Sequence, residues 1–221
     1  MQQIQITQGY CALVDDDDFA GIAKHRWYWN SHGAGYAARK ERGPDGKMHT
    51  VVMHRVIMNA PAGVQIDHIN GNGLDNRKEN LRFANTQKNA FNRRKPCILS
   101  SSKYKGVLQR SNTDYWLARL KYNNKHVELG RFANEADAGA AYNFASRVFF
   151  GDYRKENDST EIEELPEDIK DIIFMRCKKK ILKEGWKLQT GTYQNYNNRF
   201  DSAVSGRVIF LRETMQHNKQ L

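Results

Sequence analysis

Four polar residues between positions 67 and 89 have the types and spacing needed to cut a phosphodiester bond. Asp67 and His68 are adjacent, Asn80 follows twelve residues after His68, and Asn89 follows nine residues after that. Adjacent side chains on a strand point to opposite faces, so the carboxylate can hold a cation while the imidazole reaches a water. Because Mg²⁺ takes oxygen ligands and keeps several waters, one carboxylate and one amide oxygen are sufficient protein ligation. The pattern predicts metal-assisted hydrolysis.

Short polar elements must position these side chains. The sequence predicts two short strands, an intervening loop and a short helix, at Val64–Ile66, Leu81–Ala84, Asn70–Asn76 and Thr86–Asn92 respectively. Such a segment cannot build a large core, and a segment kept this polar usually serves chemistry or binding. The loop residues Asn70, Asn72 and Asn76 are expected to form turns rather than to act as ligands.

This segment resembles the ββα-metal motif of HNH nucleases, as found in phage and intron homing endonucleases. The matching text is IDHINGNGLDNRKENLR, followed by Asn89. The preceding MHRVIMNAP and the N-terminal ITQGYCALVDDDDFAGIAKHRW resemble the lead-in of that family, so the resemblance covers residues 1–92. It implies that His68 is the general base, that Asp67 ligates the metal, and that Asn80 braces the finger against the His-bearing loop.

Asn89 stands at the final position of the motif, where many members of the family have His. An Asn at this position is familiar among nicking homing enzymes, where its amide oxygen ligates the metal. The resemblance therefore implies that Asn89 is a second metal ligand. An oxygen ligand in place of an imidazole favours Mg²⁺, or Mn²⁺ as a possible substitute, over zinc.

Several neighbouring residues allow two interpretations. His54 either packs between strands, which we favour, or supports the site. Arg77 and Arg82 either clamp DNA phosphates or pair with local carboxylates. The acidic run Asp15–Asp18 is expected to be a solvated turn or helix cap rather than a metal site. The aromatic run at 27–29 is expected to pack in a core rather than to stack on bases.

A second set of elements follows residue 100. Three strand-like runs and a helix are predicted, at Tyr104–Arg110, Trp116–Tyr122, His126–Phe132 and Glu135–Phe149. Asn134 is the expected helix cap, and Gly151 the expected end of the helix. The pattern predicts a compact antiparallel three-stranded sheet with a helix packed across one face.

The text of residues 101–157 resembles the Apetala/ethylene-response-factor DNA-binding domain, through YKGV, WLARL, LGRF, EADAGAAYNFAS and FFGDY. In that family the sheet lies in the major groove, so the resemblance implies a set of DNA-facing positions: Lys105, Arg110, Arg119, Lys121 and His126. Leu108 and Glu128 replace an Arg and a Trp of the plant domains, and Arg119 replaces an acid. The target sequence is therefore not transferable.

Charge and composition agree with a polyanionic partner. The chain has 221 residues and a formal net charge of +10, and residues 61–157 contain seventeen basic and nine acidic side chains. A basic stretch of this kind suits phosphate contacts. The mean hydropathy of −0.79 excludes a membrane protein. Cys11, Cys97 and Cys177 form no CxxC pair, so neither a zinc ribbon nor a disulfide framework is indicated. We expect a soluble cytoplasmic protein, in the host cytoplasm if phage-encoded.

These features predict an α+β protein. Its expected parts are a β-rich lead-in, the HNH finger, a basic linker, the sheet-and-helix DNA-binding domain and a helical C-terminal tail of unassigned role, at residues 1–60, 61–92, 93–102, 103–157 and 158–221. The tail is expected to form one amphipathic helix over 158–184, followed by a strand-like run at Val208–Leu211.

The function predicted from the sequence is a metal-dependent, sequence-directed DNA endonuclease of homing type that acts as a monomer on duplex DNA. The sequence leaves open whether one or both strands are cut. The main alternative is a non-catalytic DNA-binding regulator with an inactive HNH module. A structure-specific nuclease or an RNA nuclease is a further alternative.

Overall fold

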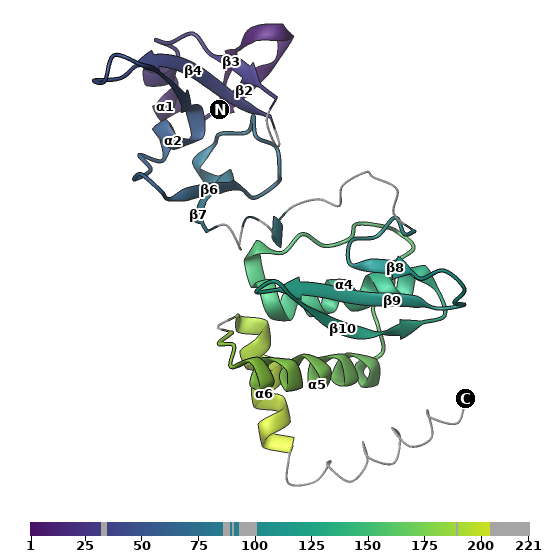
Figure 1. Cartoon of the computed structure of the whole chain (residues 1–221). Helices are drawn as coiled ribbons and strands as arrows, with labels where there is room; N and C mark the ends of the chain where they lie inside the picture. The colour runs from purple at the N-terminus through teal and green to yellow at the C-terminus, as the bar shows by residue number, and fades with distance from the viewer. Residues whose placement is uncertain (32–34, 86–88, 90, 93–100, 189, 204–221) are drawn as a thin grey trace. The chain divides into compact units, whose positions relative to one another are not determined.

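The chain divides into two units, which are described separately. The computed structural model describes residues 1–31, 35–85, 89, 91–92, 101–188 and 190–203. The units are Met1–Arg94 and Lys95–Leu221 (Figure 1). Both contain helices and small sheets, so the fold is mixed α and β as predicted. The start of the predicted helix at 86–88, most of the linker and the strand-like run at 208–211 lie outside the described residues.

The N-terminal unit is built from small antiparallel sheets and short helices. The sheets pair β1 with β2, β3 with β4 and β5, and β6 with β7. The elements are β1 (Gln2–Gln5), β2 (Cys11–Val14), α1 (Asp16–Ile22), β3 (Tyr28–Asn30), β4 (Tyr36–Arg42), β5 (Met48–Val52), α2 (Met53–Ile57), β6 (Gln65–His68) and β7 (Leu81–Ala84).

A small apolar core holds the first 57 residues together. Alternating residues of β1 and β2 face inward, where they meet Trp27 and Met53. The indole Nε1 of Trp27 donates a 2.8 Å hydrogen bond to the carbonyl of Ile22, which closes the end of α1 against the core. The expectation that the aromatic run packs in a core therefore holds for Trp27, which is buried.

The core sheet also holds the loop between β6 and β7. The amide of Leu13 on β2 donates to the carbonyl of Leu74, and the amide of Asn76 donates to the carbonyl of Leu13, both at 2.8 Å. Gly73 passes so close to β4 that a Cβ there would lie 2.0 Å from the carbonyl oxygen of Gly35. The loop is therefore fixed against β2 and β4.

The second unit contains the predicted sheet and helix. Its strands form an antiparallel sheet in the order β10-β9-β8, with a bulge between Glu128 and Gly130. Its elements are β8 (Val107–Gln109), β9 (Trp116–Tyr122), β10 (Lys125–Phe132), α4 (Glu135–Phe150), α5 (Glu167–Glu184) and α6 (Gly191–Ala203). Asn134 caps α4 by accepting from the amide of Asp137, and Gly151 follows its last residue.

Helix α4 covers one face of this sheet (Figure 1). Val107, Leu120, Val127 and Leu129 are buried beneath it, as are Tyr142 and Phe149 of the helix itself. At the ends of the strands, Trp116 and Phe132 are only half-buried.

The predicted helix over 158–184 is shorter than expected. Helix α5 begins at Glu167, directly after Pro166. Proline fixes its own φ and disfavours helical geometry in the residue before it, so the acidic residues upstream remain outside the helix. A second helix, α6, was not predicted.

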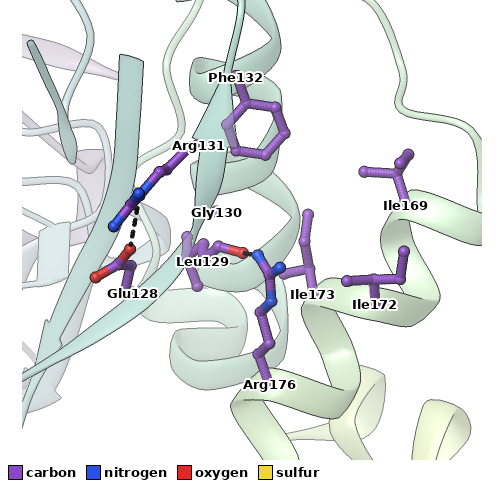
Figure 2. A pocket seen from close by; sticks show the side chains of 9 residues that line it. All are labelled: Glu128, Leu129, Gly130, Arg131, Phe132, Ile169, Ile172, Ile173 and Arg176. Carbon is purple, nitrogen blue, oxygen red and sulfur yellow. Dashed lines mark hydrogen bonds and ion pairs between the residues drawn. The ribbon is translucent and has the colours of Figure 1, made fainter. Parts of the chain in front are cut away.

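Helix α5 runs along β10, the edge strand of the sheet. Lys125 at the start of β10 pairs with Glu184 at the end of α5. Farther along, Arg176 donates a 2.6 Å hydrogen bond from Nη1 to the carbonyl of Leu129, next to the bulge (Figure 2). The helix therefore covers the edge of the sheet. Among the described residues, no helix is both long and apolar enough to cross a membrane.

Candidate functional site

Strand β6 presents Asp67 and His68 on opposite faces of the β6–β7 hairpin. Asp67 lies opposite Arg82, and His68 lies opposite Leu81. Because side chains alternate along a strand, Gln65 shares the face of Asp67. The hairpin therefore separates the carboxylate from the imidazole, as expected from their adjacent positions.

His68 is buried and is oriented by Asn76. Its Nε2 lies 3.3 Å from Oδ1 of Asn76. The amide group of Asn76 donates to the carbonyl of Leu74, which identifies Oδ1 as the atom that faces the imidazole. An amide oxygen can only accept, so Nε2 of His68 carries the proton and Nδ1 keeps the lone pair. Nδ1 is therefore the basic atom of the neutral ring.

Burial favours the neutral form of His68. Desolvation lowers the pKa of His68 below its ordinary value, although the hydrogen bond that His68 donates to Asn76 and the charges of Asp67 and Asp75 act in the opposite direction. The ring is only 5% exposed. A neutral imidazole with a fixed tautomer is the form that can accept a proton from water.

Two further rings pack around His68. His54 of α2 lies edge-on to it at 5.0 Å between ring centroids, and Tyr36 of β4 lies at 5.7 Å. His54 is buried, and its Nδ1 has no hydrogen-bond partner among the described residues. Burial lowers the pKa of His54 to about 3, with smaller contributions from His68 and Arg55. His54 thus packs, as favoured, and it packs directly against the candidate base.

Asn80 braces the loop that follows His68. Its Nδ2 donates to the carbonyl of Asp75 at 2.7 Å, and its Oδ1 accepts from the amide of Asn70 at 2.9 Å. Asn80 is buried, so both bonds are shielded from water. The bracing contact implied by the resemblance is therefore present, while a catalytic role for Asn80 stays a prediction.

The carboxylate of Asp67 is held by two side chains. Arg82 donates from Nε and Nη2 to Oδ2, at 2.9 and 2.6 Å. Nδ2 of Asn92 lies 3.1 Å from Oδ1 and also donates to the carbonyl of His68 at 2.7 Å. Of the two interpretations of Arg82, the structure shows pairing with a carboxylate. Contact with DNA stays a prediction.

Asn89 reaches the same face of the hairpin. Asn89 and Asn92 are both helical and three residues apart, which places them on one side of the helix. Nδ2 of Asn89 donates to Oε1 of Gln65 at 2.7 Å. Its Oδ1 is buried and has no hydrogen-bond partner in the described part of the chain. The helix therefore brings Asn89 to the Asp67 side, away from His68.

An oxygen-binding cation fits these residues. A buried amide oxygen without a partner costs free energy, which a hard cation with water ligands would recover. Within the described ranges, no three His, Cys, Asp or Glu side chains gather in a group that could hold a metal. The carboxylate of Asp67 and Oδ1 of Asn89 are the protein groups we consider for such a cation.

The acidic run supports the finger in a way that the sequence did not reveal. Oδ2 of Asp15 accepts from the backbone amide of Lys78, and Oδ1 of Asp18 accepts from its ammonium, at 2.8 and 2.9 Å. Asp15 makes no side-chain cap to its own helix. These carboxylates fix the turn before Asn80. Arg77 beside them donates to Asp75 from Nε and Nη2, so it too pairs with a carboxylate.

In the second unit, the sheet face opposite α4 carries a row of basic side chains. Arg119 and Lys121 on β9 lie opposite Glu128 and His126 on β10. Lys121 and His126 are exposed, Arg119 is half-exposed, and Arg110 is exposed beyond β8. Burial and the charges of Arg119 and Lys121 lower the pKa of His126. Four of the five predicted DNA-facing residues are thus accessible.

Lys105 does not share this row. Its ammonium lies 5.9 Å from the ring centroid of Tyr142 on α4, the helix side of the sheet. Burial, with a smaller contribution from Lys155, lowers its pKa to about 8. The expected DNA-facing placement of Lys105 is therefore corrected. The residue precedes β8, and the close approach of Gly106 to Tyr142 directs this segment toward the helix.

Sequence reasoning missed Asn76 and Asn92. Asn76 was interpreted as a loop former, yet it fixes the tautomer of His68. Asn92 was given no role, yet it holds Asp67 and the backbone of His68. Its three-residue spacing from Asn89 on a short helix was the available signal.

Comparisons with known proteins agree with this geometry. Residues 47–91 match the sequence model of the HNH endonuclease family, a segment that includes Asp67, His68, Asn80 and Asn89. An uncharacterized HNH endonuclease of Acanthamoeba polyphaga mimivirus is 29% identical over 151 residues, which cover 68% of this chain and 76% of that protein. Neither unit alone is long enough to contain this alignment, so it includes parts of both.

HNH nucleases generally use a divalent metal and act on DNA. The match lies over β6, β7 and the residues they position, where the geometry of a base and a cation site has just been described. Residues 47–91 are thus an HNH endonuclease domain, and the chain that carries it is a DNA endonuclease.

Proposed function

We propose that this protein is a metal-dependent, sequence-directed DNA endonuclease of homing type that acts on duplex DNA as a monomer. The observation that carries the proposal is the β6–β7 hairpin, which holds an oriented His68 on one face and, on the other, the Asp67 carboxylate and an Asn89 amide oxygen that has no partner among the described residues. These are the groups that hydrolysis of a phosphodiester requires.

His68 acts as the general base through Nδ1. Asn76 holds the proton on Nε2, so the lone pair of Nδ1 accepts a proton from water. Asn80 keeps the loop in place by bridging Asp75 and Asn70. The water then attacks phosphorus in line, and the bond from phosphorus to the 3′ oxygen breaks. The departing 3′ oxygen takes a proton from solvent and His68 releases its proton to solvent, which leaves a 5′-phosphate and a 3′-hydroxyl.

Asp67 and Asn89 hold a divalent cation, Mg²⁺ or Mn²⁺. When bound, it supplies charge neutralisation at the scissile phosphate and at the departing 3′ oxygen. Asn92 fixes the Asp67 carboxylate relative to the backbone of His68, because its Nδ2 contacts both Oδ1 of Asp67 and the carbonyl of His68. Oxygen ligands favour these ions over zinc.

The second unit grips duplex DNA through the basic row on its sheet. Arg119, Lys121 and His126, with Arg110 nearby, present donors on a face that a major groove can accept. This agrees with the resemblance to the Apetala/ethylene-response-factor domain. Glu128 in the same row opposes phosphate, so the site recognised differs from that of the plant domains.

The test is nicking of supercoiled plasmid with Mg²⁺ or Mn²⁺. Wild-type protein is expected to convert supercoiled DNA to nicked or linear product, and His68→Ala is expected to lose activity by roughly 10²–10⁴-fold, the usual contribution of a general base. His49→Ala is the matched control, because His49 is exposed and pairs with Asp45 far from β6 in sequence. It should retain wild-type activity.

Two outcomes would redirect the assignment. If wild type and His68→Ala were equally inert while both bound duplex, the chain would be a DNA-binding regulator with an inactive nuclease module. If single-stranded DNA or RNA competed with duplex as the better substrate, the specificity assigned to duplex DNA would be wrong.

A further inference from the structure

Arg82 forms an ion pair with Oδ2 of Asp67, one of the two carboxylate oxygens available to a cation. Nε and Nη2 of Arg82 both donate to Oδ2 of Asp67, while Nδ2 of Asn92 lies 3.1 Å from Oδ1. The two charged side chains are only 15% and 11% exposed. Such a pair is weakly screened by solvent and is held in one geometry by the strand register.

A cation and Arg82 therefore compete for Asp67. A guanidinium at hydrogen-bond distance neutralises the carboxylate and repels a divalent ion placed beside it. If the cation displaced Arg82, the half-buried guanidinium would lose its ion pair with Asp67, which is unfavourable. In the absence of DNA, repulsion by the Arg82 guanidinium and the loss of its ion pair therefore both weaken binding of the cation.

A DNA phosphate removes this conflict. The planar fork of an arginine matches a phosphate as well as it matches a carboxylate. A phosphate delivered to this face would pair with Arg82 and release Oδ2 of Asp67, on the same face of the hairpin as Asn89, whose Oδ1 has no hydrogen-bond partner among the described residues. Binding of DNA would then strengthen binding of the cation, and binding of the cation would strengthen binding of DNA.

We propose that Arg82 couples binding of the divalent cation to binding of DNA by exchanging Asp67 for a phosphate. The inference rests on the proposed function, since it takes Asp67 as a cation ligand. It makes Arg82 a positioning residue that keeps the cation site closed until nucleic acid arrives.

Thermodynamic linkage gives the expected size and symmetry of the effect. If Mn²⁺ strengthens DNA binding by some factor, DNA strengthens Mn²⁺ binding by the same factor, and typical couplings are roughly 5- to 150-fold. Removing the arginine should abolish most of this coupling. It should also strengthen Mn²⁺ binding to the protein without DNA, because the competitor is gone.

The experiment uses the full chain in a His68→Ala background, so that DNA remains intact. Affinity for a fluorescent mixed-sequence duplex is measured by anisotropy with and without Mn²⁺ at constant ionic strength. Mn²⁺ affinity of the protein alone is measured by electron paramagnetic resonance. The parent is expected to show coupling within the range above, and Arg82→Gln is expected to show less than about a twofold effect of Mn²⁺ on DNA binding.

Arg77→Gln is the matched control. Arg77 makes the same two-donor contact with a carboxylate, at 2.8 Å from both Nε and Nη2, but its partner is Asp75. This variant should lose a basic side chain and yet keep the full coupling. Should Arg82→Gln unfold, Arg82→Lys retains the charge without the fork, and its coupling should be weaker than that of the parent.

The inference is wrong if Arg82→Gln and Arg82→Lys keep the coupling and the DNA-free Mn²⁺ affinity of the parent. Failure of the proposed function has a different signature. In that case Asp67→Ala would leave Mn²⁺ binding unchanged, and wild-type protein would not nick plasmid.

Discussion

His54 is a buried histidine whose neutral form is favoured in the folded protein. Its ring lies edge-on to His68, and burial lowers its pKa to about 3 from an ordinary value of 6.5. The unfolded chain therefore binds a proton at His54 throughout the interval between these two values, whereas the folded protein does not.

This difference predicts acid sensitivity of the N-terminal unit. Stability from His54 is fully present above pH 6.5, and the free energy of unfolding falls as pH decreases toward about 3. The contribution is at most about 1.4 kcal/mol per pH unit. His54→Leu should make the decline shallower, measured by hydrogen exchange of the β4 and β6 amides across a pH series. An unchanged slope would show that His54 titrates normally, and exposed His49→Leu provides the comparison.

At the residue scale, the sequence indicated candidates for the reacting groups but not the residues that hold them. Asp67, His68, Asn80 and Asn89 are proposed from their spacing, their residue types and the resemblance to the HNH motif. Asn92 is not among them, because its contacts with Asp67 and with the carbonyl of His68 depend on how the helix is placed on the hairpin. A polar residue in a polar segment gives no sign of which backbone group it will meet.

At the element scale, the loop from Asn70 to Asn76 depends on its contact with β4. A Cβ at Gly73 would lie 2.0 Å from the carbonyl oxygen of Gly35 and 2.8 Å from the ring of Tyr36. A backbone oxygen cannot rotate away, so the loop itself would have to move. That loop supplies Asn76, which orients His68.

Gly73→Ala is accordingly expected to lower the free energy of unfolding by about 1–3 kcal/mol and to reduce nicking as well. Thermal melting and the plasmid assay measure the two effects. Gly21→Ala in α1 is the control, because a Cβ there meets nothing within 4 Å and alanine favours a helix. Wild-type activity in Gly73→Ala would mean that the loop can shift without moving His68.

Helix boundaries were predicted correctly where a capping residue or a terminal glycine marks the end of the helix. Asn134 and Gly151 delimit α4 as predicted, because a cap and a terminal glycine act locally. The start of α5 was misplaced because Pro166 was given no weight against the amphipathic pattern upstream. Lys105 was misplaced because its side chain precedes β8, where the alternation of a strand does not yet apply.

At the scale of the whole molecule, the proposed function places cleavage in the N-terminal unit and DNA binding in the second unit. Replacing Arg119 and Lys121 by Gln should therefore weaken DNA binding without altering the chemical step. We expect KM to rise with kcat unchanged, and the slope of log affinity against log salt to fall by roughly 2, one unit for each lost phosphate contact.

Plasmid nicking at saturating DNA and anisotropy over a salt series measure these quantities. Lys103→Gln with Lys125→Gln removes the same charge from residues already paired with Glu161 and Glu184, and should have a smaller effect. A fall in kcat with unchanged KM would contradict the division of labour.

Long-range contacts set the limit of what the sequence could predict about the whole chain. Local motifs predicted the β6–β7 hairpin and the sheet with helix α4. They did not predict the role of Asp15, because its carboxylate holds the amide of Lys78, 63 residues away. Such pairings emerge only when the sheets are assembled.

The position of α5 along β10 has a consequence for the integrity of the second unit. β10 is an edge strand, and edges with unpaired backbone groups recruit strands from other molecules. Arg176 of α5 donates to the carbonyl of Leu129, and Ile169, Ile172 and Ile173 of the same helix line a pocket together with β10 (Figure 2). Helix α5 thus occupies part of the hydrogen-bonding edge of β10 that a strand of another molecule would otherwise use.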